Sequence, residues 1–381
     1  MTASRPTVAL TLGDPAGIGP EIMAKALAEG SAYDRLIPVA IGDGGVLAQV
    51  IEGCGLDLAI RRVDTPADAH GERGTVDLVD LDNMGEVRFG QIDAAHGRAA
   101  LEWIERACAL AREGAVDGIV TGPINKEAAK AGGLKFPGHT ELLADLLGAD
   151  PDDVYTMFVV GRLRIFFLTR HLSLRDAIDA LEEDRVHGAI VHVARLLRDL
   201  GVDEPHVALA ALNPHAGEGG MMGREEIDIL RPAVERARAD GVHVSGPVPA
   251  DAVFHQGREG RFDGVISLYH DQGHVASKTL DFFGTVSATL GLPVIRTSVD
   301  HGTAYDLAGR FEADARGQVA ALRVAAELAP GALRAAAARA RAPTPAGGGP
   351  RRARQPRPRN GIRVAVTVMN RTLASSGRLA M

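Results

Sequence analysis

Residues 265–274, VISLYHDQGH, indicate the fold more clearly than any other stretch of this sequence. An apolar run typical of a buried β-strand changes abruptly to polar and titratable residues. Residues 165–171, IFFLTRH, and residues 209–215, LAALNPH, have the same arrangement. Ligand sites in α/β proteins gather at the carboxyl ends of strands, so we expect the histidines that follow these three strands to lie at one edge of a sheet. They are His171, His215 and His270.

A site of three imidazoles suits Zn²⁺ or a similar divalent ion (Mg²⁺, Mn²⁺ or Co²⁺) and leaves positions open for a substrate oxygen. The alternative is that each is an ordinary surface or hydrogen-bonded loop histidine. His274 lies four residues after His270 and would share its helical face. It is either a fourth ligand, a group that orients a ligand, or a polar residue of the helix start.

The rest of the chain alternates apolar runs of strand length with amphipathic helical patterns, which is typical of a layered α/β protein. Two apolar runs separated only by Gly161 and Arg162 predict a hairpin, so we expect a mixed sheet. Expected strands cover residues 8–12, 37–41, 118–121, 154–160, 163–168, 207–212 and 265–269. A first helix is expected to start at residue 20. Further helices are expected over residues 44–53, 94–113, 174–181, 184–200, 224–240 and 317–328.

Composition and length indicate a soluble globular protein of one large or two smaller α/β domains, and we expect it to be cytoplasmic. The 381 residues include no apolar run of the roughly 20 residues that a membrane span needs, and no secretory signal is expected. Two cysteines, Cys54 and Cys108, are too few for a disulfide framework.

The C-terminal segment differs from the rest of the chain. Residues 331–381 contain 11 Arg and no acidic residue, among many Ala, Pro and Gly residues. We expect this tail to be disordered, and its composition also fits translation beyond the natural end of the gene, for instance after a frameshift. It has no aromatic residue to stack on bases, so nucleic-acid binding is not expected.

Candidate anion-binding groups lie in several of the segments that follow strands. Lys126, Lys278 and Arg296 could hold a carboxylate or a phosphate, although any one of them could be a solvated surface charge. His139 and Thr140 open a predicted helix after Pro-Gly, where free backbone N–H groups also favour anions. The glycines of residues 13–21 do not fit the dinucleotide pattern G-x-G-x-x-G and could reflect tight-turn geometry alone.

Taken together, these motifs resemble the 4-hydroxythreonine-4-phosphate dehydrogenase (PdxA-like) family of the vitamin B6 pathway. The resemblance covers about residues 5–330 and is carried by LGDPAGIGPE (12–21), TGPINK (121–126), GHTE (138–141), TRHLSLRD (169–176), LNPHAGEGG (212–220), GPVPAD (246–251), YHDQG (269–273) and GLPVIRTSVDHGTA (291–304).

The resemblance implies a two-domain, mixed-sheet fold like that of isocitrate and isopropylmalate dehydrogenases, with the active site in the interdomain cleft. Residues 1–125 plus 285–330 would form the first domain, residues 126–284 the second, with most metal ligands, and residues 331–381 the tail. A homodimer would share its active sites between subunits.

By motif position, the resemblance implies metal binding at His171, His215 and His270, and substrate binding at His139, Thr140, Lys278, Ser287 and Arg296. It implies NAD or NADP, bound without the glycine fingerprint, and leaves the cofactor-binding residues unassigned. The general base is open among Asp251, Lys126 and a metal-bound water. The expected reaction is metal-dependent oxidation of 4-hydroxythreonine 4-phosphate, with decarboxylation of the β-keto acid, in pyridoxal 5′-phosphate biosynthesis.

Two positions leave the substrate open. Ser287 stands where the family usually has asparagine, and serine lacks the amide. His274, within HDQGH, resembles a paralogous branch acting on four-carbon acid sugar phosphates such as D-threonate or D-erythronate 4-phosphate. More remote alternatives are a metallohydrolase or metal-dependent aldolase with the same histidines, and a non-catalytic ligand-binding protein.

Overall fold

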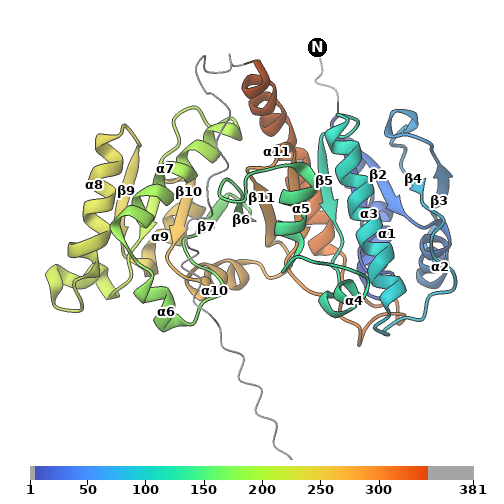
Figure 1. The fold of residues 1–381 in the computed structure, drawn as a ribbon, viewed down its shortest axis with the longest axis horizontal. Helices are drawn as coiled ribbons and strands as arrows, with labels where there is room; N and C mark the ends of the chain where they lie inside the picture. Colours follow the sequence, from blue (N-terminus) through green and yellow to red (C-terminus); the bar gives the residue numbers. More distant parts are fainter. Residues whose placement is uncertain (1–4, 342–381) are drawn as a thin grey trace, which may run out of the picture. The chain divides into compact units, whose positions relative to one another are not determined.

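The computed structural model describes residues 5–341, which form an α/β structure around one mixed sheet (Figure 1). Its strands follow the order β3-β4-β2-β1-β5-β12-β11-β6-β7-β10-β8-β9. The expected α/β class and mixed sheet are therefore confirmed. The strands are β1 (Thr7–Thr11), β2 (Ile37–Gly42), β3 (Ala59–Arg62), β4 (Thr75–Asp80), β5 (Gly118–Thr121), β6 (Tyr155–Val160), β7 (Leu163–Phe167), β8 (Val207–Ala210), β9 (Val244–Val248), β10 (Gly264–Ser267), β11 (Val286–Leu290) and β12 (Ile295–Val299).

The antiparallel pairs lie in the middle of the sheet. The predicted hairpin is present as β6 and β7, and β11 runs antiparallel to both β6 and β12. On one side, β12 joins the parallel set that contains β5, β1, β2, β4 and β3. On the other side, β7, β10, β8 and β9 are parallel neighbours. Within each outer part of the sheet, the carboxyl ends of the parallel strands therefore lie at a common edge.

Helices cover both faces of the sheet. Phe166 and Phe167 of β7 point to opposite faces, because successive side chains in a strand alternate, and they belong to two different apolar clusters. Helix α7 packs in the cluster of Phe166, whereas α9 packs in the cluster of Phe167. The helices are α1 (Gly19–Glu29), α2 (Gly44–Cys54), α3 (Ala94–Arg112), α4 (Lys126–Ala131), α5 (His139–Leu147), α6 (Leu174–Asp179), α7 (Glu183–Asp199), α8 (Arg231–Ala239), α9 (Ala250–Arg258), α10 (His270–Leu280) and α11 (Arg316–Arg341).

Helix α3 illustrates how the sequence specifies these elements. The Asp93 side chain caps its start by accepting from the backbone N–H of Ala95 at 2.7 Å. Its apolar stripe, with Trp103 fully buried, packs against β1, β2 and β5. Trp103 also donates to the side-chain oxygen of Asn83 at 3.0 Å, which satisfies its buried N–H group.

The glycine loop after β1 is explained by close backbone approach. A Cβ on Gly19 would lie 2.4 Å from the carbonyl oxygen of Leu12, and one on Gly17 would lie 2.8 Å from Cβ of Thr303. Gly13 adopts a φ of 81°, a conformation that favours glycine. Close packing and backbone conformation therefore explain these glycines, and ligand binding is not required to account for them.

Helix α11 corrects the expected start of the tail. The helix continues to Arg341, so residues 331–341 are helical and not disordered. Their alanine-rich composition favours a helix. Residues 342–381 lie outside the described part of the chain, and the expectation for them stays untested. The predicted division into domains at residues 125 and 284 also stays untested. The sheet is continuous across both positions.

Among residues 5–341, no helix has the length and apolar character needed to cross a membrane.

Candidate active site

The three predicted metal ligands follow three neighbouring parallel strands. Strand β10 lies between β7 and β8 and is parallel to both. Their carboxyl ends therefore lie at the same edge of the sheet, where His171, His215 and His270 follow them. The strand-end arrangement expected from the sequence is present in the fold.

Two of these histidines approach each other, and the third does not join them. The ring centroids of His171 and His270 are 6.2 Å apart. His215 lies in the turn η3 (Pro214–Gly220), is exposed, and places Nδ1 3.4 Å from Oε2 of Glu218. Within residues 5–341, no group of three or more His, Cys, Asp or Glu side chains is arranged to hold a metal ion. Metal binding by the three histidines stays a prediction.

The ionisation state of His171 suits coordination of a divalent ion. The pKa of His171 is lowered, first by partial desolvation and then by the positive charges of Arg170 and His270. A lowered pKa keeps the imidazole neutral at physiological pH, which is the form that coordinates metal.

His274 orients His270. Their rings stack at 3.5 Å, and Nδ1 of His274 lies 2.9 Å from the carbonyl oxygen of His270. The ring of His274 also packs against Phe158 and Phe167, at 4.4 and 4.7 Å. Of the three roles that the sequence left open, a group that orients His270 fits these contacts best.

A buried carboxylate that we did not identify from the sequence holds the turn of His215. Glu226 is fully buried, and its Oε1 accepts from the backbone N–H groups of Leu212 and Asn213 at 2.8 and 2.7 Å. Its Oε2 accepts from the side-chain amide of Asn213 at 2.8 Å. The turn needs this support, because His215 (φ 52°) and two other non-glycine residues within it adopt positive φ angles, each at a cost of about 1–3 kcal/mol. The only local signal was a pair of glutamates after a glycine-rich segment.

Replacing Glu226 with glutamine should loosen this turn. An amide presents an NH₂ group where the backbone donates, so at least one hydrogen bond is lost inside a buried site, and the free energy of unfolding should fall by about 1–3 kcal/mol. Amide hydrogen exchange at Leu212 and Asn213 should accelerate. Asp228→Asn is the matched control, since Asp228 is exposed on the same segment and pairs with Arg224. Equal protection of the two amides in E226Q and wild type would contradict this role.

Arg296 is the strongest anion-binding candidate. Its side chain lies on β12 and is almost fully buried. Its Nε and Nη2 donate to the hydroxyl of Thr121 at 3.1 and 2.6 Å, and Nη1 donates to that of Thr289 at 3.4 Å. No carboxylate of the described chain pairs with it, and burial lowers its pKa to about 10. Because a buried cation without a counter-charge is unfavourable, the arrangement favours an anionic ligand here.

The positive charge of Arg296 also acts on His139. It opens α5, and although the residue is only half-buried, its Nε2 is enclosed and has no hydrogen-bond partner among the described residues. Its pKa is lowered to about 3, first by desolvation and then by Arg296 and Lys126. The ring is therefore a neutral hydrogen-bonding group that is available to a ligand. The charges of Arg296 and Lys126 therefore both act on the ring of His139.

The low pKa of His139 should make stability depend on pH. An unfolded histidine binds a proton near pH 6.5, whereas folded His139 does so only near 3. Between these values the unfolded state holds more protons, so the free energy of unfolding should fall by about 1.5 kcal/mol from pH 6.5 to pH 5 through this residue. Denaturant titrations of wild type and His139→Gln at both pH values measure the difference. An equal pH dependence in the two proteins would refute the assignment.

The other predicted substrate-binding residues are Lys278, Thr140 and Ser287. Lys278 of α10 is paired: its Nζ lies 2.8 Å from Oδ2 of Asp300 and donates to the Asp300 carbonyl oxygen at 3.0 Å. An anion would therefore compete with Asp300 for it. Thr140 follows His139 at the start of α5, and Ser287 is half-buried on β11, opposite Ser298 of β12 and Phe158 of β6.

Asp251 lines a cavity that none of the predicted metal ligands lines. The residue is exposed in the first turn of α9, and the cavity, of about 430 Å³, lies between α9 and α10. Within that cavity it is accompanied by His255 and by Val275. The structure gives Lys126 a closer association with the site, through its effect on His139 and His171.

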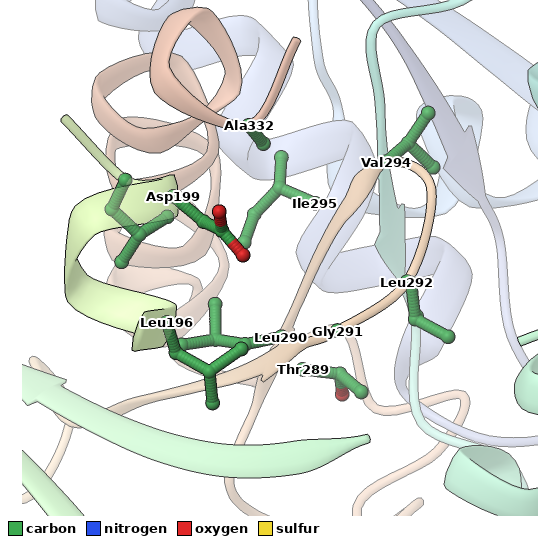
Figure 2. Close-up of a pocket in the computed structure, with 10 residues that line it drawn as sticks. Leu196, Asp199, Thr289, Leu290, Gly291, Leu292, Val294, Ile295 and Ala332 are labelled. Carbon is green, nitrogen blue, oxygen red and sulfur yellow. The ribbon is translucent and has the colours of Figure 1, made fainter. Parts of the chain in front are cut away.

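A separate small cavity is not the site. Figure 2 shows its mostly apolar lining, from the end of α7, the turn after β11 and α11. Its volume of about 20 Å³ is enough for little more than one water molecule. None of the predicted site residues lines it.

Comparison with known proteins identifies the family. The family model of the pyridoxal phosphate biosynthetic protein PdxA matches residues 34–325. The chain belongs to the PdxA family. Its predicted resemblance is thereby confirmed, and the chain is a PdxA-like dehydrogenase.

Several relatives of this PdxA-family chain carry the provisional name D-threonate 4-phosphate dehydrogenase. One from Halalkalibacterium halodurans is 49% identical over 328 residues, covering 86% of this chain and 98% of the relative. One from Symbiobacterium thermophilum is 50% identical over 328 residues, covering 86% and 97%. Among solved structures, the 4-hydroxythreonine-4-phosphate dehydrogenase of Klebsiella pneumoniae is 42% identical, with a TM-score of 0.78, covering 85% of this chain and 99% of that one.

Proposed function

We propose that this PdxA-family chain oxidises D-threonate 4-phosphate, or a closely related four-carbon acid phosphate, with NAD⁺ or NADP⁺ as the hydride acceptor. The observation that carries the proposal is the buried, unpaired Arg296 beside neutral His139, at a sheet that also presents His171 and His270. The names of the relatives that are 49–50% identical support this substrate. The second candidate is 4-hydroxythreonine 4-phosphate, the substrate in the name of the Klebsiella pneumoniae structure.

Substrate charge favours the first candidate. 4-Hydroxythreonine 4-phosphate carries an ammonium group, whereas threonate 4-phosphate carries a hydroxyl in its place and is more negative. The described site offers Arg296 and Lys126 without a nearby carboxylate partner for either. Ser287 is also compatible with a hydroxylated substrate, since its hydroxyl both donates and accepts.

Each residue then has a defined task. Arg296 holds an anionic group of the substrate by a planar fork of donors, while neutral His139 donates or accepts through Nε2. A secondary alcohol loses a hydride to NAD(P)⁺ and a proton to a base, for which Lys126 is better placed than Asp251 and a metal-bound water remains an alternative. The resulting β-keto acid loses CO₂.

A divalent ion held by His171, His215 and His270 would polarise the substrate oxygen and stabilise negative charge on it. Three imidazoles suit Zn²⁺, with Mg²⁺, Mn²⁺ or Co²⁺ as alternatives. Because one chain brings only His171 and His270 together, we propose a homodimer in which a second subunit completes the site. Exposed Val275 and Phe282, on and just after α10, support a contact there. Phosphorylated acids and nicotinamide cofactors are cytoplasmic metabolites, so we propose that compartment.

A substrate panel tests the proposal. Formation of NADH or NADPH should be followed with threonate, erythronate and 4-hydroxythreonine 4-phosphates, each with added divalent metal and each cofactor. We expect the highest kcat/KM with a four-carbon acid phosphate. No reduction of either cofactor with any of the three would reject the dehydrogenase assignment, and cleavage or hydrolysis without reduction would favour a metal-dependent aldolase or hydrolase.

A further inference from the structure

A second cavity opens where β6 begins and β7 ends, next to the edge that carries the histidines. Its volume is about 310 Å³. Two arginines, Arg170 and Arg185, line it together with hydroxyl-bearing and apolar residues, and no acidic residue does. Its full lining is Val154, Tyr155, Thr156, Phe167, Leu168, Thr169, Arg170, Leu172 and Arg185.

Both guanidinium groups retain free donors. Arg170 donates through Nη1 to the hydroxyl of Thr156, and Arg185 donates through Nη2 to the carbonyl oxygen of Leu168 at 3.2 Å. Both acceptors are neutral, and neither arginine forms an ion pair within residues 5–341. Each guanidinium has five N–H donors, so most of them face no protein acceptor.

The two charges act on the same space. Both arginines favour the ionised form of Tyr155, which lines the cavity and whose hydroxyl donates to the carbonyl oxygen of Phe167 at 2.9 Å. A second hydroxyl, that of Thr169, donates to the carbonyl oxygen of Leu268 at 2.8 Å. The third, that of Thr156, accepts from Arg170. The guanidinium groups are therefore the charged donors that this cavity offers to a ligand.

The cavity is connected to Arg296 across the sheet. Thr156 of β6 accepts from Arg170 and lies directly opposite Thr289 of β11. Thr289 in turn lies opposite Arg296 and accepts from it. Paired side chains on adjacent strands share a face and lie about 5 Å apart. A polar row therefore leads from Arg170 to the proposed substrate arginine.

We propose that Arg170 and Arg185 form a second anion-binding site, which takes the phosphate group of a phosphate ester. Paired guanidinium forks match phosphate oxygens, and the absence of lining carboxylates leaves their charge uncompensated. The phosphate belongs either to the acid substrate or to the nicotinamide cofactor. The choice between these two sources rests on the proposed dehydrogenase function, whereas phosphate binding itself does not.

The test combines direct binding with kinetics on the full chain. Calorimetry with inorganic phosphate and with threonate 4-phosphate is performed on wild type, on Arg170→Gln/Arg185→Gln and on Arg323→Gln, an exposed control on α11. Loss of charged hydrogen bonds should weaken phosphate-ester binding roughly ten- to hundredfold in the double variant and leave the control unchanged. Arg170→Lys/Arg185→Lys keeps the charge and should recover part of the affinity, which excludes misfolding as the cause.

The kinetic arm identifies the source. A raised KM for the acid phosphate alone assigns the site to the substrate, and a raised KM for the cofactor alone assigns it to the cofactor. Unchanged affinity for phosphate and for both phosphate-bearing ligands would overturn the proposal. If wild type binds phosphate through these arginines but reduces no cofactor, the anion site stands and the dehydrogenase function fails.

Discussion

Replacing Arg296 with methionine should lower kcat/KM for the phosphorylated substrate by about two to three orders of magnitude. The guanidinium is buried and has only two threonine hydroxyls as partners, so the ligand would supply its counter-charge. Loss of one partner of a buried charge pair costs about 2–5 kcal/mol of binding, and each 1.4 kcal/mol is tenfold. Steady-state kinetics should show the loss mainly in KM if the contact is equal in ground and transition states.

The same substitution should leave the protein as stable as before, or more stable. Burial lowers the pKa of Arg296 to about 10, below its unfolded value, so the folded state disfavours the charge. This unfavourable contribution is fully present below pH 10 and is relieved as the pH rises through 10 toward the unfolded pKa. Removing the charge removes this unfavourable contribution to the free energy of folding. A residue retained for substrate binding can thus lower the stability of the fold.

Two measurements can contradict this assignment. Arg296→Lys serves as the matched variant: it retains the charge without the planar fork and should fall between wild type and Arg296→Met in kcat/KM. An unchanged kcat/KM in Arg296→Met would remove Arg296 from the substrate site. A Tm far below that of wild type would show that the guanidinium stabilises the fold.

Replacing His215 with alanine should abolish metal-dependent turnover while changing the free energy of unfolding by less than about 0.5 kcal/mol. The side chain is 65% exposed and contributes no core packing, so the fold should tolerate its loss. If His215 completes a three-histidine site, two ligands remain, and kcat/KM should fall by at least about three orders of magnitude with the loss of Lewis-acid chemistry.

Metal content is the decisive readout for His215. Atomic emission on purified protein should show bound divalent metal in wild type and little in His215→Ala. His255→Ala, which removes an exposed histidine of α9, should retain metal. Treatment of wild type with a chelator should abolish activity, and added Zn²⁺, Mn²⁺, Co²⁺ or Mg²⁺ should restore it. Unchanged metal content and activity in His215→Ala would remove the metal from the proposed mechanism.

The sequence identified the elements whose signals are local. The β6–β7 hairpin follows from two apolar runs around Gly161, and α3 follows from its apolar stripe. Five strands were not identified because their composition hides them. Strand β3 contains two arginines, β9 contains Gly246 and Pro247, and β4, β11 and β12 carry polar residues on their buried faces.

By itself, the sequence determined that three histidines end three strands and that the chain resembles the PdxA family. Only the tertiary structure decided that β10 lies between β7 and β8, and that Arg296 is buried without a carboxylate. It also decided that Lys278 pairs with Asp300, and that Glu226 holds the His215 turn. The physical reason is that strand ends and caps depend on residues close in sequence. Burial, charge pairing and pKa depend on neighbours that only long-range packing brings together.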